Sequence, residues 1–165
     1  MFQKLRSDLV KELSPIRLVL VNADGFSENG KAPSTSLGLN GSTISVLRDE
    51  GVECVAFSAL KSQEISSVAE KMGIELHQSV LEKSDFYAKM KSEFSLQDTQ
   101  IALICRDQED LVIMKKASFS AATSEAPLEV KAHSYYAAYN KGSGAVEEIA
   151  ELIIKSKKYP DGWSE

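Results

Sequence analysis

One apolar segment near the N-terminus constrains the fold of this chain more than any other feature. Residues 16–21, apolar except for Arg17, have the composition of a central parallel strand that is covered on both faces. Similar strand-like segments at 52–57, 74–77 and 101–105 alternate with segments whose apolar residues recur at helical spacing. This alternation predicts an α/β fold: a doubly wound, Rossmann-like parallel sheet in a three-layer α/β/α sandwich.

The segments between and after these strands predict six helices and two small outer strands. The expected helices cover 2–13, 42–50, 62–73, 83–94, 111–117 and 145–158, and the outer strands cover 119–122 and 135–139. Ser42 and Ser62 are suitable N-caps, and Gly51 and Gly73 follow the ends of the same two helices. Residues 27–41, rich in Ser, Gly, Asn and Pro, predict a long loop or weak hairpin, and 159–165 a loosely held tail.

Length and charge limit the classes of protein to which the chain can belong. Its 165 residues predict one domain, 1–165, in which 1–15 is an N-terminal helical segment. The 19 basic and 24 acidic residues give a net charge of -5, which argues against nucleic-acid binding because phosphate backbones attract basic surfaces. No apolar run approaches the length of a membrane-spanning helix, and the N-terminus does not resemble a signal peptide. Cys54 and Cys105 are expected to be free buried thiols, so a cytoplasmic protein is expected.

Polar side chains follow four successive strands of the predicted sheet. The carboxyl ends of parallel strands meet at one edge, where α/β proteins bind their ligands. Taken singly, an Asp-Gly pair after a strand is usually a turn, and one lysine at the start of a helix is usually solvated. Their joint occurrence predicts a site formed by Asn22, Asp24, Ser58, Lys83, Arg106, Asp107 and Asp110.

These positions, in this order, resemble the motifs of haloacid dehalogenase-like phosphatases. The resemblance is closest to the capless branch typified by 3-deoxy-D-manno-octulosonate 8-phosphate phosphatase, and it covers residues 16–155. The family's Asp-x-Asp-Gly, Thr-Gly-Arg, helix-opening Lys and Gly-Asp-Asp-x-x-Asp motifs correspond to 22–25, 58–60, Lys83 and 105–110. Its glycine-rich segment before the last helix corresponds to 141–146. The resemblance implies the strand order 5-4-1-2-3.

The chain departs from these motifs at two positions that carry the chemistry of the family. In the family, the first Asp of the first motif attacks phosphorus, and Mg²⁺ is bound by this Asp and the first Asp of the fourth motif. These positions hold Asn22, which is a poor nucleophile, and Arg106, which cannot bind a cation. Asp24, Ser58 and Lys83 keep the family pattern, so with Asn22 they are vestigial catalytic positions by resemblance.

Because the metal-binding position of the family is lost, we expect a side chain of the protein to supply the positive charge there. No metal or other cofactor is expected, because Arg106 stands where the family has a metal-binding Asp. The guanidinium is expected to lie in the site, paired with a carboxylate of Asp24, Asp107 or Asp110.

The resemblance and the departures together imply a non-catalytic relative of sugar-acid phosphate phosphatases, a pseudo-phosphatase with an assembly or regulatory role in nucleotide-sugar or surface-glycan metabolism. Two alternatives stay open. One is a Mg²⁺-dependent phosphatase of altered mechanism that uses Asp24, Lys83 and Asp107. The other is a phosphate or sugar-phosphate binding module in which Ser58, Lys83 and Asn40 hold the anion.

Partners are also implied by the resemblance. A homo-oligomer is expected, tetrameric as in the family, or a complex with a sugar-nucleotide enzyme, because the fold also occurs attached to acylneuraminate cytidylyltransferases. The loop at 27–41 is shorter than in the family, so it is not expected to enter a neighbouring subunit's site. His77 and His133 lack metal-ligand neighbours and are expected to be structural, and the tyrosines at 135, 136 and 139 are expected to pack an outer strand.

Overall fold

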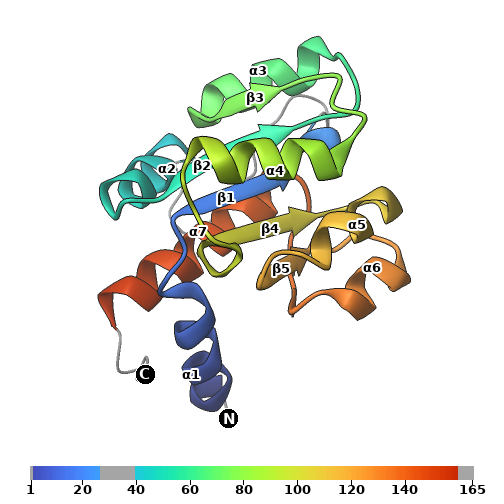
Figure 1. The fold of residues 1–165 in the computed structure, drawn as a ribbon. Helices are drawn as coiled ribbons and strands as arrows, with labels where there is room; N and C mark the ends of the chain where they lie inside the picture. Colours follow the sequence, from blue (N-terminus) through green and yellow to red (C-terminus); the bar gives the residue numbers. More distant parts are fainter. Residues whose placement is uncertain (1, 27–39, 160–165) are drawn as a thin grey trace.

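The computed structural model describes residues 2–26 and 40–159, and the side chains of residues 8–26 and 43–159. Six parallel strands form one sheet in the order β3-β2-β1-β4-β5-β6 (Figure 1). In chain order they are β1 (Leu18–Asn22), β2 (Glu53–Phe57), β3 (Glu75–His77), β4 (Ile101–Cys105), β5 (Phe119–Ala122) and β6 (Tyr136–Ala137). The predicted parallel sheet and its order 5-4-1-2-3 are confirmed, with the short β6 added beside β5.

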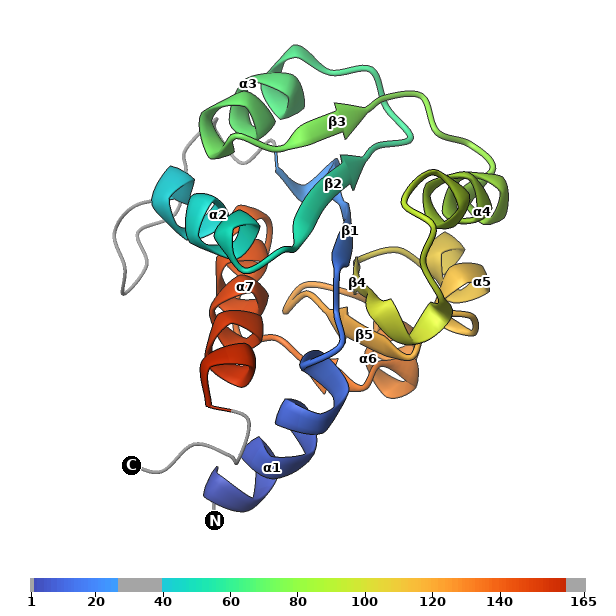
Figure 2. The same ribbon diagram turned by 60° about the vertical axis from the view of Figure 1, so that its left-hand side comes forward.

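Helices cover both faces of the sheet, so the predicted three-layer sandwich is also confirmed (Figure 2). One face carries α1 (Phe2–Leu13), α2 (Asn40–Asp49), α3 (Gln63–Met72) and α7 (Ser143–Lys158). The other carries α4 (Lys83–Glu93), α5 (Leu111–Met114) and α6 (Leu128–His133). The sequence pattern did not predict α6, and α5 ends at Met114 rather than near residue 117. Of the predicted loop at 27–41 and the predicted tail at 159–165, residues 27–39 and 160–165 lie outside the described residues, and residues 40 and 41 belong to α2.

The first strand is buried on both faces, which explains its continuous apolar sequence. Val19 and Val21 pack into the core beneath α1, α2, α3 and α7, while Leu18 and Leu20 pack into the core beneath α4, α5 and α6. All four side chains are almost fully buried. The first polar residue after this run, Asn22, therefore marks the carboxyl end of the central strand.

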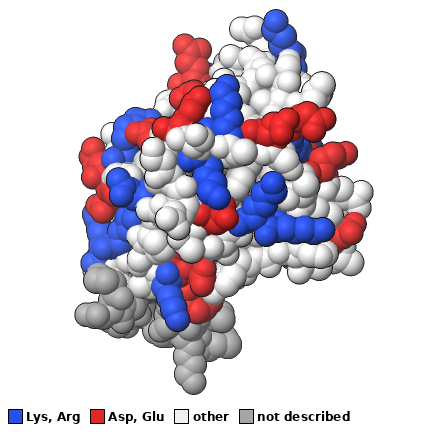
Figure 3. All heavy atoms as spheres, in the orientation of Figure 1, with Lys and Arg blue, Asp and Glu red and all other residues white. Residues whose placement is uncertain are grey.

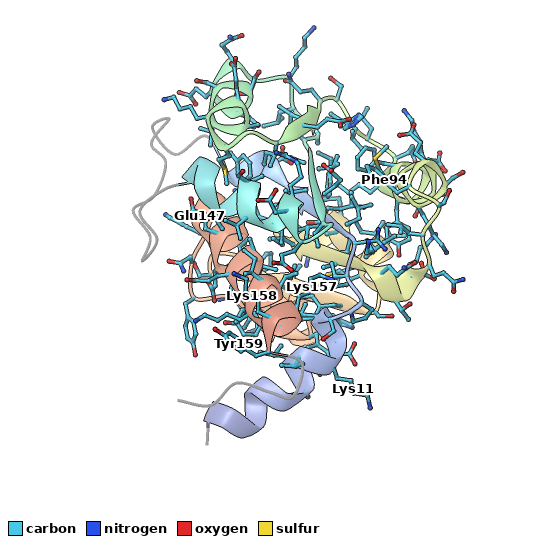
Figure 4. All side chains as sticks on the ribbon, turned by 90° about the vertical axis from the view of Figure 1, so that its left-hand side faces the viewer. Lys11, Phe94, Glu147, Lys157, Lys158 and Tyr159 are labelled. Carbon is cyan, nitrogen blue, oxygen red and sulfur yellow. The ribbon has the colours of Figure 1, made fainter. Side chains whose placement is uncertain are left out.

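The last helix packs along the first one. The Nζ atom of Lys157 in α7 donates a hydrogen bond to the carbonyl oxygen of Ser14, directly after α1, at 2.7 Å. Burial and the nearby charge of Arg17 lower the pKa of Lys157. Figure 4 shows Lys157 and Lys158 near the C-terminal end of α7, where basic side chains offset the negative end of the helix dipole.

Three short 3-10 helices complete the described chain, and two of them form the candidate site. They are η1 (Ala23–Gly25), η3 (Asp98–Gln100) and η4 (Gln108–Asp110). None of the described helices is both long enough and apolar enough to cross a membrane. Basic and acidic side chains are interspersed over the face drawn in Figure 3. The absence of a nucleic-acid partner stays a prediction.

The two cysteines are predicted to be inert in the folded protein. Both are free and buried, as the sequence indicates. Burial raises the pKa of the Cys54 thiol to about 12 and raises that of Cys105 well above its usual range. Because the thiolate is the reactive form, Ellman's reagent at pH 8 should leave both thiols unmodified in the folded chain and modify both in guanidinium chloride. Rapid modification of either thiol without denaturant would contradict this burial.

Candidate functional site

The carboxyl ends of β1, β2 and β4 meet at one edge of the sheet, and the predicted site residues converge there. Asn22 is the last residue of β1, and Ser58 directly follows β2. Lys83 begins α4, and the segment from Arg106 to Asp110 follows β4. Hydrogen bonds connect all seven residues that the strand ends predicted. For Asn40, the eighth candidate, the side chain lies outside the described part of the chain.

The Asn22 side chain is buried, and its amide orientation is fixed by its partners. Its Oδ1 accepts a hydrogen bond from the backbone N–H of Asp24 at 2.9 Å. Its Nδ2 donates to Oδ2 of Asp107 at 3.0 Å and to Oδ2 of Asp110 at 2.8 Å. The reverse orientation would place a carbonyl oxygen against two carboxylates, which cannot donate when ionised. The residue at the family's nucleophile position therefore presents an amide NH₂ group to its neighbours.

The Asp110 carboxylate lies at the centre of these contacts. It is fully buried, and its Oδ1 lies 2.6 Å from Nζ of Lys83, which is also buried. Its Oδ2 accepts the backbone N–H groups of Arg106 and Asp107 at 2.8 and 3.0 Å, besides the amide of Asn22. A buried ion pair is tolerated when hydrogen bonds satisfy its remaining polar atoms, as they do for the Asp110 carboxylate. The lysine charge is therefore neutralised inside the protein.

The Arg106 side chain is paired inside the site, as the sequence predicts. Its Nη1 donates to Oδ1 of Asp107 at 2.9 Å, and its Nε donates to Oε2 of Glu125 at 3.1 Å. Burial alone would lower the pKa of Arg106, but the Asp107 and Glu125 carboxylates outweigh it, so the net direction is upward. Asp107 is one of the predicted partners. Glu125, which lies between β5 and α6, carries no motif and was missed by the sequence analysis.

A second contact network joins Asp24 to the end of β2. The Ser58 hydroxyl donates to Oδ1 of Asp24 at 2.5 Å, and its Oγ accepts the backbone N–H of Leu60 at 3.0 Å. Ser58 is fully buried, whereas Asp24 is partly exposed. Asp24 is thus a partly accessible carboxylate at the end of β1.

Two glycines allow the surrounding segments to approach η1 closely. A Cβ atom on Gly25 would lie 2.9 Å from both Nε of Arg106 and Oε2 of Glu125. Gly142, directly before α7, has a φ of 57°, and a Cβ atom there would lie 2.9 Å from the carbonyl oxygen of Gly25. The glycine-rich segment at 141–146 therefore has a packing role beside the site.

The side chains present do not fit a magnesium ion at the family's metal position. Mg²⁺ requires hard oxygen ligands in octahedral geometry. Here Asn22 directs its amide nitrogen, not its oxygen, toward the two aspartates, and a guanidinium occupies the fourth-motif position. In the described parts of the chain, no group of three or more His, Cys, Asp or Glu residues is arranged to hold a metal ion. The cation that the structure places beside Asp107 is the guanidinium of Arg106, at 2.9 Å.

The remaining candidates lie outside this network. The His77 ring contacts Glu75 at 2.6 Å and packs against Phe86. The Nδ1 atom of His133 lies 3.0 Å from the carbonyl oxygen of Glu129. The Tyr136 hydroxyl donates to Glu148 at 2.8 Å, on the outermost strand. The contacts of His77, His133 and Tyr136 agree with the structural roles that the sequence predicts. The prediction is wrong for Tyr139, which is 82% exposed and lies outside the short strand Tyr136–Ala137.

Comparison with known proteins agrees with the observed fold. No protein-family model matches the chain. It is 27% identical to N-acylneuraminate cytidylyltransferase A of Danio rerio over 87% of its own length, but spans only 36% of that relative. It is 24% identical to 3-deoxy-D-manno-octulosonate 8-phosphate phosphatase of Yersinia pestis, covering 94% of this chain and 88% of the relative.

A solved structure of the Moraxella catarrhalis phosphatase, in complex with a magnesium ion, a phosphate ion and 3-deoxy-D-manno-octulosonate, is similar with a TM-score of 0.78 at 22% identity. The match covers 94% of this chain and 95% of that one. The chain has a capless haloacid dehalogenase-like fold. Within this fold it resembles the sugar-acid phosphate phosphatases, whereas Asn22 and Arg106 differ from the motifs of that family.

Replacing the central amide with a carboxylate tests the charge state of the site. Asn22→Asp is predicted to destabilise the folded chain at pH 7 by about 3 kcal/mol, because three buried or half-buried carboxylates would then be in contact. Burial and like charges raise the folded-state pKa of the new carboxyl above its unfolded value of about 4. The loss relative to the parent chain is therefore small at pH 4 and grows as the pH rises.

Urea unfolding at pH 4.5 and pH 7 measures this difference. Asn22→Ser is the matched control, because it removes the amide hydrogen bonds without adding charge and should show a nearly pH-independent loss. An Asn22→Asp variant that loses the same stability at both pH values would show that the two aspartates are not ionised neighbours of this amide.

The guanidinium is expected to stabilise the two carboxylates that it contacts. Arg106→Ala is predicted to lower the free energy of unfolding at pH 7 by about 1–2 kcal/mol, because Asp107 and Glu125 lose their cation. Arg106→Lys should recover only part of this loss, since an ammonium lacks the planar fork that reaches both carboxylates. Arg48→Ala is the control, because the Arg48–Glu53 pair is exposed and should contribute little. Equal effects of Arg106→Ala and Arg48→Ala would contradict the role assigned to Arg106.

Proposed function

We propose that this chain is a non-catalytic relative of the sugar-acid phosphate phosphatases, with an assembly or regulatory role in nucleotide-sugar or surface-glycan metabolism. The observation that carries the proposal is the contact of the Asn22 amide nitrogen with Asp107 and Asp110. At the position of the family's nucleophile, the chain has a neutral donor whose oxygen is already bonded to the backbone of Asp24.

The chemistry of phosphoryl transfer supports this proposal. A covalent route needs an anionic nucleophile, and catalysis depends on cations that neutralise the charge of the phosphoryl group. The amide of Asn22 is not a nucleophile, and the ammonium of Lys83 is already paired with Asp110 at 2.6 Å. The guanidinium of Arg106 is shared between Asp107 and Glu125. The cations of the site are thus satisfied by the protein itself.

The similarity to a cytidylyltransferase supports the assembly role. The aligned part covers most of this chain but about one third of that relative, so a fold of this kind can accompany a sugar-nucleotide enzyme in one polypeptide. We propose that this chain associates with such an enzyme or with copies of itself, as a tetramer by resemblance, in the cytoplasm. In this proposal, the short segment of the chain at 27–39 does not enter the site of a neighbouring subunit.

A phosphatase of altered mechanism is the second candidate, and one contact favours it. Asp24 is partly exposed, and the Ser58 hydroxyl orients its carboxylate. This is the geometry of a general acid or base at the end of β1. The same Ser58 could take part in holding an anion in a binding module. The test below separates all three functions.

The purified chain with Mg²⁺ is predicted to hydrolyse neither p-nitrophenyl phosphate nor 3-deoxy-D-manno-octulosonate 8-phosphate above the uncatalysed rate. Asn22→Asp alone should stay inactive, because Arg106 remains in the metal position. In the double variant Asn22→Asp/Arg106→Asp, Mg²⁺ should raise Tm by a few degrees, whereas it should not change the Tm of the parent chain.

Three results would distinguish the alternatives. Turnover by the parent chain that is lost in Asp24→Asn would establish the phosphatase. A rise in Tm with inorganic phosphate alone, lost in Ser58→Ala, would establish the anion-binding module. Inactivity in all conditions with no response to phosphate is the result that the proposed non-catalytic role requires.

A further inference from the structure

Three helices lie side by side on one face of the sheet and run in the same direction. They are α4, α5 and α6, and α5 in the middle packs against both of the others (Figure 1, Figure 2). Each helix follows a strand of the parallel sheet, so each begins near the carboxyl edge and runs back toward the amino edge. We call their outer surface, together with Glu82 and η4, the α4–α6 face.

Along α5, the exposed side chains follow an order from acidic through apolar to basic. Glu109 lies in η4, which continues directly into α5. Val112, which is 46% exposed, follows three residues later, and the exposed Lys115 and Lys116 follow after three and four more. Residues three or four apart lie on the same side of a helix, so these side chains form one row. Its acidic end lies at the carboxyl edge, and its basic end lies nearer the amino edge.

The helix α4 shows the same order of charge. Glu82 and Asp85 are exposed near the carboxyl edge, and Lys89 is exposed one turn further along the helix. Ala88, which is also exposed, precedes Lys89 in place of a large apolar side chain. The acidic end of this row therefore lies on the same side of the face as the acidic end of the row on α5.

The helix α6 completes the pattern. Leu128, which begins the helix, is 82% exposed, and the partly exposed Lys131 follows three residues later on the same side. The carboxylate of Glu129 is held near the carboxyl edge, because it accepts a 2.8 Å hydrogen bond from the side chain of Gln108 in η4. This bond also ties α6 to the segment that leads into α5, so the two rows are neighbours.

The other charged side chains of this face interrupt the pattern at one position. Lys91 and Asp98, toward the amino edge, form an ion pair with each other at 3.0 Å, and Arg106 is paired as described above. Glu93, at the end of α4, is exposed in the basic half of the face. Apart from it, the side chains of the face for which the described part of the chain provides no ion pair are acidic near the carboxyl edge and basic toward the amino edge: Glu82, Asp85, Glu109 and Glu129, against Lys89, Lys115, Lys116 and Lys131.

A surface with charges in this order is complementary to itself. A two-fold axis through Val112, normal to the face, places α5 antiparallel to α5 of a second copy, and α4 opposite α6 of that copy. Glu109 then faces the lysines of the opposite α5, and the acidic side chains at the start of α4 face Lys131 of the second copy. Val112 faces its own counterpart at the axis. Each acidic end therefore meets a basic end, and apolar area is buried between them.

We propose that the α4–α6 face binds a second copy of this chain in a two-fold symmetric dimer. The proposal rests on the assembly role proposed above and names the surface that performs it. A partner surface of one charge sign would match one half of the face and be repelled by the other half, whereas a second copy matches both. The net charge of -5 on each copy opposes association at long range, and the three helices are short. An interface at the small end of the size range is therefore expected, with a dissociation constant of about 10 μM.

Charge reversal followed by mixing tests this symmetry by sedimentation velocity. The acidic ends are reversed in Glu82→Lys/Glu109→Lys, and the basic ends in Lys115→Glu/Lys131→Glu. At about 100 μM the parent should be mostly dimeric. Each variant alone should bind itself at least tenfold more weakly, because charges of one sign then face each other. An equimolar mixture of the two variants should form a heterodimer with nearly the affinity of the parent, because each acidic end again faces a basic end.

Two controls separate the interface from effects on folding. Glu64→Lys/Glu70→Lys makes the same change in charge on α3, on the other face of the sheet, and should leave the dimer intact. Val112→Asp places two carboxylates at the axis and should dissociate the dimer, whereas Val46→Asp, at an exposed position of α2, should not. All of these side chains are exposed, so the variants should keep nearly the Tm of the parent.

A parent chain that stays monomeric at about 100 μM would overturn the proposal. So would a parent oligomer that neither charge reversal weakens, or a mixture of the two variants that does not associate. The test is also independent of catalysis. A chain that hydrolyses phosphate esters and still forms this dimer would refute the non-catalytic role and leave the interface in place. An inactive chain that is monomeric, or whose dimer resists both reversals, would refute the interface alone.

Discussion

The buried carboxylate of Asp110 is the interaction on which the arrangement of the site depends. Its two oxygens accept four hydrogen bonds: from the side chains of Asn22 and Lys83, and from the backbone of Arg106 and Asp107. An unpaired charge at a fully buried position would cost several kcal/mol, so losing any of the four donors is expected to destabilise the fold. This requirement fixes the end of β1, the start of α4 and η4 relative to one another. It also pairs the ammonium of Lys83 and orients the amide of Asn22.

The parts of the structure that the sequence predicts well are those in which local pattern and tertiary packing agree. The apolar run of β1 can be recognised in the sequence because both faces of this strand are covered. Lys83 begins α4, as expected. The convergence of the strand ends follows from parallel topology alone, so Asn22, Asp107 and Asp110 could be predicted as neighbours. By contrast, α6 has six residues, too few for a helical period to be recognised.

Glu125 is a residue of the site that could not be predicted from the sequence. It lies in the connection between β5 and α6, and no motif or periodicity distinguishes it there. Its role arises because β5 pairs with β4, which places this connection beside the segment that follows β4. Only then does the carboxylate reach Arg106, at 3.1 Å. The side chain of Asn40 is a different case, because the described part of the chain does not include it.

The residues at 22 and 106 are physically coupled through Asp107, which accepts hydrogen bonds from both. A carboxylate at 22 would add negative charge next to Asp107 while the guanidinium still excluded a cation. A carboxylate at 106 would remove the positive charge while the amide at 22 still offered nitrogen rather than oxygen. Neither single change is therefore expected to create a metal site. In this chain, the cation beside Asp107 is a side chain of the polypeptide itself.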